Sequence, residues 1–135
     1  MFEKYHYLYV EDDPLSREIM QVAIQEIMGA PGLTVFESSE NFIGRLRSLN
    51  PTPDLIMLDI HMEPVDGFEM LRLLRTESDF CDKIVIALTA SVMNEEIRKL
   101  QKIGFDGAIG KPINVTKFPE LIARVLNGES VWEVT

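Results

Sequence analysis

The chain has 135 residues, of which 46% are hydrophobic and 26% charged, with a formal net charge of −9 and a pI near 4.7. This size and composition suit one globular domain with one core. The negative charge argues against nucleic acid or an anionic membrane as the main partner, because both would repel the protein. No apolar stretch approaches the length of a membrane span, and residues 1–4 lack a signal-peptide pattern. A single cysteine excludes an internal disulfide, so we expect a reduced, cytoplasmic protein.

Apolar runs alternate with amphipathic segments along the chain. A short, continuous apolar run is typical of a buried strand in a parallel sheet. The expected strands are residues 7–10, 33–36, 55–58, 84–88 and 107–109. The last of these contains glycine and is short, which weakens a strand prediction, and its place in the series is the reason to keep it.

Helix signals fall between these runs. Asp13 precedes a proline and is expected to cap the first helix. Ser38 or Ser39 is expected to cap the second, and a third helix follows a turn-rich stretch at residues 61–66. Asn94 is expected to cap the fourth helix, and a fifth begins near Thr116.

The resulting series is (βα)5, an α/β fold. Right-handed crossovers place helices on both faces of a doubly wound parallel sheet, and the flavodoxin-like strand order 2-1-3-4-5 is the expected topology. Residues 1–128 are predicted to form this domain. Residues 129–135 are predicted to be a tail without an element of its own, in which Trp132 lies.

Polar side chains follow the expected strands. Glu11 and Asp12 come directly after the first strand, Asp59 after the third, Thr89 after the fourth and Lys111 after the fifth. In open α/β sheets, the ligand crevice lies beyond the carboxyl ends of the strands. We therefore expect these five side chains to meet in one pocket.

Three carboxylates in one pocket need a counter-charge. Two carboxylates at about 4 Å repel by roughly 4 kcal/mol at an effective dielectric near 20. A divalent cation reverses this balance, and Mg²⁺ suits hard oxygen ligands and phosphate, with Mn²⁺ as a second candidate. Asp59 could then be a carboxylate nucleophile, with Lys111 stabilising a transferring phosphoryl group and Thr89 bonding one of its oxygens.

Four short motifs, in this order and at these intervals, resemble those of response regulator receiver domains. They are Glu11-Asp12, the stretch from Asp59 to Asp66-Gly67, Thr89-Ala90 and Lys111-Pro112. The resemblance covers residues from about Tyr5 to Val125. It implies a five-stranded flavodoxin-like domain that a histidine kinase or a histidine phosphotransfer protein phosphorylates.

The resemblance also implies a role for each matching position. Asp59 would be the phosphoacceptor. The metal ligands would be the carboxylates of Glu11, Asp12 and Asp59 and the backbone carbonyl of His61.

The remaining matched positions lie after the fourth and fifth strands. Thr89 would be a switch hydroxyl that follows the phosphoryl group, and Lys111 would pair with Asp59 or its phosphate. The family often has a cis peptide bond before the proline that is here Pro112.

The chain departs from the family's pattern at two positions. Ala108 stands where the family usually has an aromatic residue whose rotamer reports phosphorylation, so the usual coupling of threonine to aromatic is not expected at this position. Pro64 comes one position later than usual, which indicates a locally reshaped loop. His61 and Ser91 occupy the positions that tune loss of the phosphoryl group in the family.

The function expected on this basis is that of a single-domain response regulator in a phosphorelay. It would be a phosphoacceptor rather than a turnover enzyme, with an unidentified downstream protein as partner, and either a monomer or a phosphorylation-dependent dimer. One alternative is an Mg²⁺-dependent phosphohydrolase of the haloacid dehalogenase type, which would need a second aspartate where His61 stands. The other is a pseudo-receiver that binds proteins without phosphorylation, a reading that Ala108 favours slightly and the complete acid set opposes.

Overall fold

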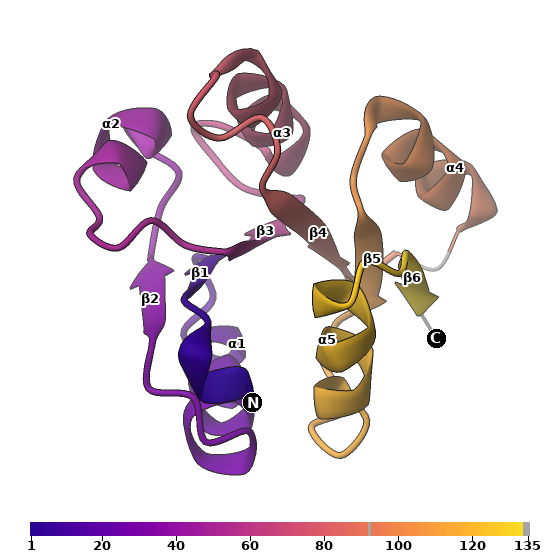
Figure 1. Ribbon diagram of the computed structural model, residues 1–135. Helices are drawn as coiled ribbons and strands as arrows, with labels where there is room; N and C mark the ends of the chain where they lie inside the picture. Colours follow the sequence, from indigo (N-terminus) through magenta and orange to yellow (C-terminus); the bar gives the residue numbers. More distant parts are fainter. Residues whose placement is uncertain (92, 134–135) are drawn as a thin grey trace.

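A six-stranded sheet with helices on both faces forms the body of the molecule (Figure 1). The computed structural model describes residues 1–91 and 93–133. The strands are β1 (Tyr7–Val10), β2 (Leu33–Phe36), β3 (Leu55–Asp59), β4 (Ile84–Thr89), β5 (Gly107–Gly110) and β6 (Val131–Glu133). The helices are α1 (Pro14–Gln21), α2 (Phe42–Arg47), α3 (Gly67–Thr76), α4 (Asn94–Ile103) and α5 (Phe118–Leu126), with a 3₁₀ turn η1 (Phe2–Lys4) and a π-helical segment η2 (Val22–Ile27).

The strands are ordered β2-β1-β3-β4-β5-β6, and every neighbouring pair is parallel. The predicted order 2-1-3-4-5 is confirmed for the first five strands. The prediction that residues 129–135 hold no element is wrong for Val131–Glu133, which pair with the edge of β5. A strand of three residues is too short to show a period in the sequence, which explains the error. Residues 134–135 lie outside the described part of the chain.

Two hydrophobic clusters lie on opposite faces of the sheet. Leu8 and Val10 of β1 pack in one cluster with side chains from α2, α3 and α4. Tyr7 and Tyr9 of the same strand pack in the other cluster, with side chains from α1, η2 and α5. Figure 1 shows α2, α3 and α4 on one side of the sheet and α1 and α5 on the other. The central strands are therefore buried on both faces, which is why their sequences read as unbroken apolar runs.

Some of the predicted helix starts are confirmed and others are not. The carboxylate of Asp13 accepts the backbone N–H of Ser16 at 2.9 Å and caps α1 as expected. Neither Ser38 nor Ser39 caps α2; Asn41, with a left-handed φ of 49°, precedes it. The Ser39 hydroxyl instead accepts a backbone N–H from the loop after β3. A tertiary contact has thus displaced the local capping interaction.

The later helices begin close to the predicted positions. Asn94 is the first residue of α4 rather than its cap, and α5 begins at Phe118, two residues after Thr116. Shifts of this size are ordinary at helix ends.

Arg75 ties together three segments at the amino edge of the sheet. From the last turn of α3, its guanidinium donates to the carbonyls of Cys81 and Lys83 before β4, at 3.0 and 2.8 Å. It also donates to the carbonyl of Gly104 and pairs with Asp106, both at 3.0 Å. This end of the molecule is therefore held by charge-assisted bonds that span α3, β4 and the α4–β5 turn.

Candidate functional site

The strand register brings the predicted site residues to one edge of the sheet. Val10 of β1 is level with Leu58 of β3, so Glu11 and Asp59 are the next residues along. Thr89 of β4 is level with Gly110 of β5, and Lys111 follows. Because neighbouring parallel strands end at the same edge, the polar residues that follow them cluster there.

The three acids form one group. Glu11 and Asp59 are buried, whereas Asp12 is exposed to solvent. One carboxylate oxygen from each lies within 4.8 Å of the others. Two buried acids with a third at the surface could hold a divalent cation that keeps part of its water shell.

Lys111 supplies the positive charge within this cluster. Its ammonium is 2.7 Å from Oε1 of Glu11 and 3.4 Å from Oδ1 of Asp59. The side chain is only 18% exposed, and its backbone N–H donates to the carbonyl of Thr89 at 2.8 Å. The expected pairing with Asp59 is therefore present, but the shorter contact is to Glu11. The peptide bond between Lys111 and Pro112 is cis, as the family resemblance implied.

One cation does not balance two buried carboxylates. Burial, together with the hydrogen bond and negative charge of Glu11, raises the pKa of Asp59 to about 7, against the lowering effect of Lys111. Burial also opposes ionisation of Glu11, but hydrogen bonds from Lys111 and Tyr9 outweigh it and lower the pKa of that carboxyl. Burial favours loss of the Lys111 proton, yet its two acidic neighbours raise the pKa of the ammonium. The cluster thus lacks one positive charge, which fits a divalent cation bound to these oxygens.

Thr89 and Ser91 lie at the end of β4, beside the acids. Thr89 is fully buried, and its hydroxyl oxygen accepts the backbone N–H of Ser91 at 3.1 Å. A hydroxyl that acts as an acceptor keeps its own proton for a second partner. This threonine can therefore donate to an oxygen at the mouth of the site.

The loop between β3 and α3 is held against the phosphoacceptor candidate by Gly67. The Gly67 N–H donates to the carbonyl of Ile60 at 2.9 Å. A Cβ at this position would lie 2.8 Å from the Cα of Ile60 and 3.0 Å from the carbonyl oxygen of Asp59. The Asp66 carboxylate caps α3 by accepting the N–H of Glu69 at 2.9 Å. The start of α3 thus fixes the backbone that carries Asp59.

The same loop carries His61 at the mouth of the site. Its imidazole is 67% exposed, and Nε2 lies 3.4 Å from a carboxylate oxygen of Glu96 on α4. Glu96 is mostly buried, with 17% of its side chain exposed. The loop after β3 and the first turn of α4 therefore contact each other through this pair.

Two supporting residues were not predicted. The Tyr9 hydroxyl donates to Oε1 of Glu11 at 2.6 Å, and burial together with that carboxylate raises the pKa of the phenol. Tyr9 and Glu11 are two positions apart at the end of a strand, so the two-residue period could have placed them on one face. The Arg17 guanidinium on α1 donates to the carbonyls of Glu11 and Asp12 at 3.2 and 2.8 Å. Both contacts hold the acidic segment in place.

Comparison with known proteins identifies the same architecture. The family model for the response regulator receiver domain matches residues 7–124. A probable C4-dicarboxylate response regulator, DctR of Halalkalibacterium halodurans, is 30% identical over 117 residues, which are 87% of this chain and 49% of that protein. The chain thus spans about half of that relative. The polar-differentiation response regulator DivK of Brucella anthropi is 27% identical over 119 residues, covering 88% of this chain and 94% of DivK.

Solved structures agree in fold. The chemotaxis response regulator CheY4 of Vibrio cholerae superposes with a TM-score of 0.79 at 21% identity, over 90% of this chain and 98% of CheY4. The receiver domain of a histidine kinase from Syntrophus aciditrophicus gives a TM-score of 0.78 at 26% identity, over 92% and 91% of the two chains. Among the described residues, no helix has both the length and the apolar composition needed to cross a bilayer. The matched family model, the parallel sheet and the acid cluster at its carboxyl edge together show that this chain belongs to the receiver-domain family of two-component response regulators.

Proposed function

We propose that this receiver domain accepts a phosphoryl group on Asp59 and that Asp59 phosphorylation controls binding of a downstream protein. One observation carries the proposal. Asp59 is a buried carboxylate at a strand end, 3.4 Å from the Lys111 ammonium and within one cluster of three acids. A nucleophilic carboxylate, a cation for the transferring group and metal-binding oxygens are the parts that aspartyl phosphate formation requires.

The transfer begins from a phosphohistidine of a histidine kinase or a histidine phosphotransfer protein. An oxygen of the Asp59 carboxylate attacks phosphorus, and a new O–P bond forms as the N–P bond breaks. The electron pair of that bond remains on the departing imidazole nitrogen. Lys111 stabilises negative charge on the transferred group, and the Thr89 hydroxyl donates to one of its oxygens.

Glu11, Asp12 and Asp59, with the backbone carbonyl of His61, would hold Mg²⁺, and Mn²⁺ fits the same ligands. The bound ion would supply positive charge against the phosphoryl oxygens. The chain's own residues prepare the acids for it, because Tyr9 and Lys111 keep Glu11 ionised by hydrogen bonds of 2.6 and 2.7 Å.

Charge and family membership support a protein partner. The net charge of −9 disfavours nucleic acid and anionic membranes. The similarity to the response regulator DivK, over 94% of that regulator's length, supports a role as a response regulator. The comparisons favour neither the phosphohydrolase nor the pseudo-receiver alternative.

The test uses a small phosphodonor, such as acetyl phosphate, with and without Mg²⁺. Intact-mass measurement should show one phosphoryl group on the wild-type chain only when Mg²⁺ is present, and treatment with hydroxylamine should remove it. Asp59→Asn should not be labelled, whereas Asp82→Asn, at an exposed site, should be labelled like the wild type. Labelling of Asp59→Asn would remove Asp59 from its proposed role.

A further inference from the structure

The edge of β5 is built to receive β6. In the register of the two strands, Gly107 is level with Val131 and Ala108 with Trp132. A Cβ at position 107 would lie 2.6 Å from the carbonyl oxygen of Val131, a distance that the protein cannot accommodate without moving one of the strands. Val131 is buried against the sheet. The glycine in β5 is therefore explained by the strand that lies beside it.

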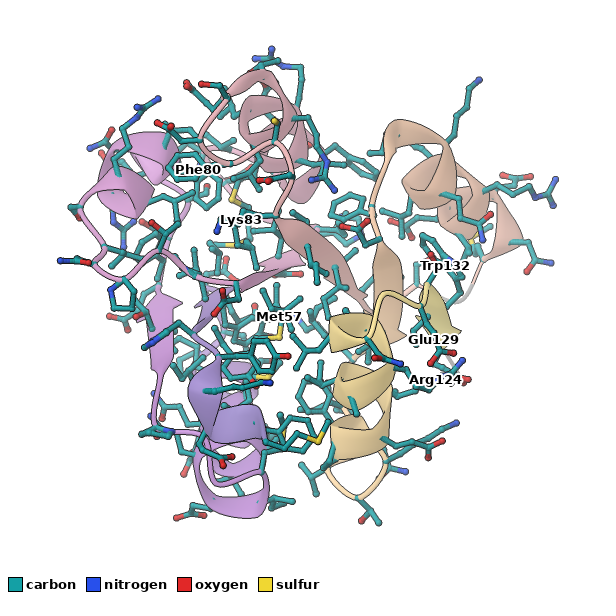
Figure 2. The ribbon with its side chains drawn as sticks, viewed as in Figure 1. Met57, Phe80, Lys83, Arg124, Glu129 and Trp132 are labelled. Carbon is teal, nitrogen blue, oxygen red and sulfur yellow. The ribbon has the colours of Figure 1, made fainter. Side chains whose placement is uncertain are left out.

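Trp132 lies on the α4 face of the sheet, level with two alanines. Ala87 of β4, Ala108 of β5 and Trp132 of β6 are level with one another across three parallel strands. Both alanines are fully buried, and the half-buried indole packs against the hydrophobic cluster that contains them. Figure 2 shows Trp132 between β6 and α4. Two small side chains in this row leave room for a large ring beside them.

The β4 alanine of this row lies close in sequence to the threonine of the site. Thr89 is two residues after Ala87 in β4, so both point to the same face of the sheet. The indole is thus an aromatic ring supplied by a neighbouring strand, on the face that carries the threonine of the site. Val131 is the buried anchor of β6, and Glu133 pairs with Lys117 at 3.2 Å.

We propose that Trp132 is the positioning residue through which the state of Asp59 reaches the surface formed by α4, β5 and β6. The inference rests on the proposed phosphorylation of Asp59. A phosphoryl group on Asp59 accepts a hydrogen bond from the Thr89 hydroxyl and draws it toward the site. In the unphosphorylated structure, the oxygen of this hydroxyl accepts the backbone N–H of Ser91. Movement of Thr89 toward the site opens space beside Ala87, and the indole moves inward over the two alanines. Because the ring belongs to β6, this strand tightens on β5 at the same time.

Trp132 is the single tryptophan of the chain, so its intrinsic fluorescence reports on this position alone. Beryllofluoride with Mg²⁺ serves as the phosphoryl mimic, and ¹⁹F NMR of the bound fluorides measures loading of the site independently. Loading should shift Trp132 emission to the blue and reduce its quenching by acrylamide. A loaded site with unchanged or increased quenching would overturn the role of Trp132 and leave the proposed function intact. A site that does not load would end both.

Reciprocal coupling gives a second measurement. If loading draws the indole inward, loss of the ring must weaken beryllofluoride binding, and we expect a loss of about fivefold or more for Trp132→Ala. Trp132→Phe should recover most of the affinity, because it restores an aromatic ring. Val22→Ala, at a partly exposed apolar position, is the matched control and should bind like the wild type. Equal affinities for the alanine and phenylalanine variants would refute the coupling.

A third variant displaces β6 without touching its side chains. Gly107→Ala introduces the Cβ that meets the Val131 carbonyl. Trp132 should then be more accessible to acrylamide in the unloaded protein, and loading should no longer change its emission. An emission change equal to that of the wild type would show that the signal does not depend on β6 pairing and would overturn the inference.

Discussion

Replacing Asp59 with asparagine should make the folded protein more stable near neutral pH. Burial and Glu11 raise the pKa of Asp59 to about 7, whereas an unfolded aspartate has a pKa of about 3.9. Between these values, the folded protein holds a proton that the unfolded chain has released. Stability therefore falls as the pH rises through this window, and the loss is complete above the folded-state pKa. Asparagine has a similar shape and no charge to bury.

The size of the gain follows from the difference between the two pKa values. That difference corresponds to at most ~4 kcal/mol at pH 8. It already includes the attraction of Lys111, whose ammonium lies 3.4 Å from the carboxylate, and relaxation of the cluster around an ionised Asp59 makes the effective cost smaller. The 2.7 Å contact from Lys111 to Glu11 remains. We therefore expect Asp59→Asn to raise the free energy of unfolding by ~1–3 kcal/mol near pH 8.

Urea unfolding in a metal-free buffer measures this gain. The difference between Asp59→Asn and the wild type should be ~1–3 kcal/mol at about pH 8 and close to zero at about pH 4. The exposed Asp82→Asn variant should differ little from the wild type at either pH. A gain of equal size at both pH values, or a loss at the higher pH, would contradict the electrostatic reasoning.

Three further outcomes follow from the site geometry. At ten times its Kd, Mg²⁺ should stabilise the wild type by about 1.4 kcal/mol, and calorimetry should show most of this gain missing in Asp12→Asn; an undiminished gain would exclude Asp12 as a ligand. Gly67→Ala should destabilise the protein by ~1–3 kcal/mol in urea, because its Cβ meets the Ile60 backbone at 2.8 Å, and wild-type stability would disprove that contact. Tyr9→Phe should lower the free energy of unfolding in urea by ~1–3 kcal/mol, because it removes a buried donor 2.6 Å from Glu11, and wild-type stability would count against that bond.

The sequence predicts the sheet because its strands are buried on both sides. Runs such as residues 55–58 and 84–88 are continuous and apolar, and the structure covers both faces of each with helices. The polar residues that follow the strands then converge by topology alone. This is why Glu11, Asp59 and Lys111 could be placed together from the order of the motifs.

Other features depend on contacts that a linear pattern does not contain. The shorter bond from Lys111 goes to Glu11 rather than Asp59, a preference set by side-chain geometry at the edge of the sheet. Ser39 is drawn from the helix start to a distant backbone N–H, which leaves Asn41 before α2. Trp132 joins the sheet because Gly107 of β5 leaves room for the Val131 backbone and Ala108 lies level with the indole, and none of this is visible in the tail's own sequence.

The Arg75 network holds the amino edge of the sheet more tightly than the carboxyl edge, where the acids lie. Bonds from one guanidinium to Lys83, Gly104 and Asp106 fasten α3, β4 and the C-terminal end of α4 to one another, far from the acids. At the N-terminal end of α4, the described residues contact the loop after β3 through the longer pair of His61 and Glu96, 3.4 Å apart. We expect α4 to pivot about its C-terminal end, which Arg75 holds, so that a displacement at the acid cluster tilts the helix rather than translating it.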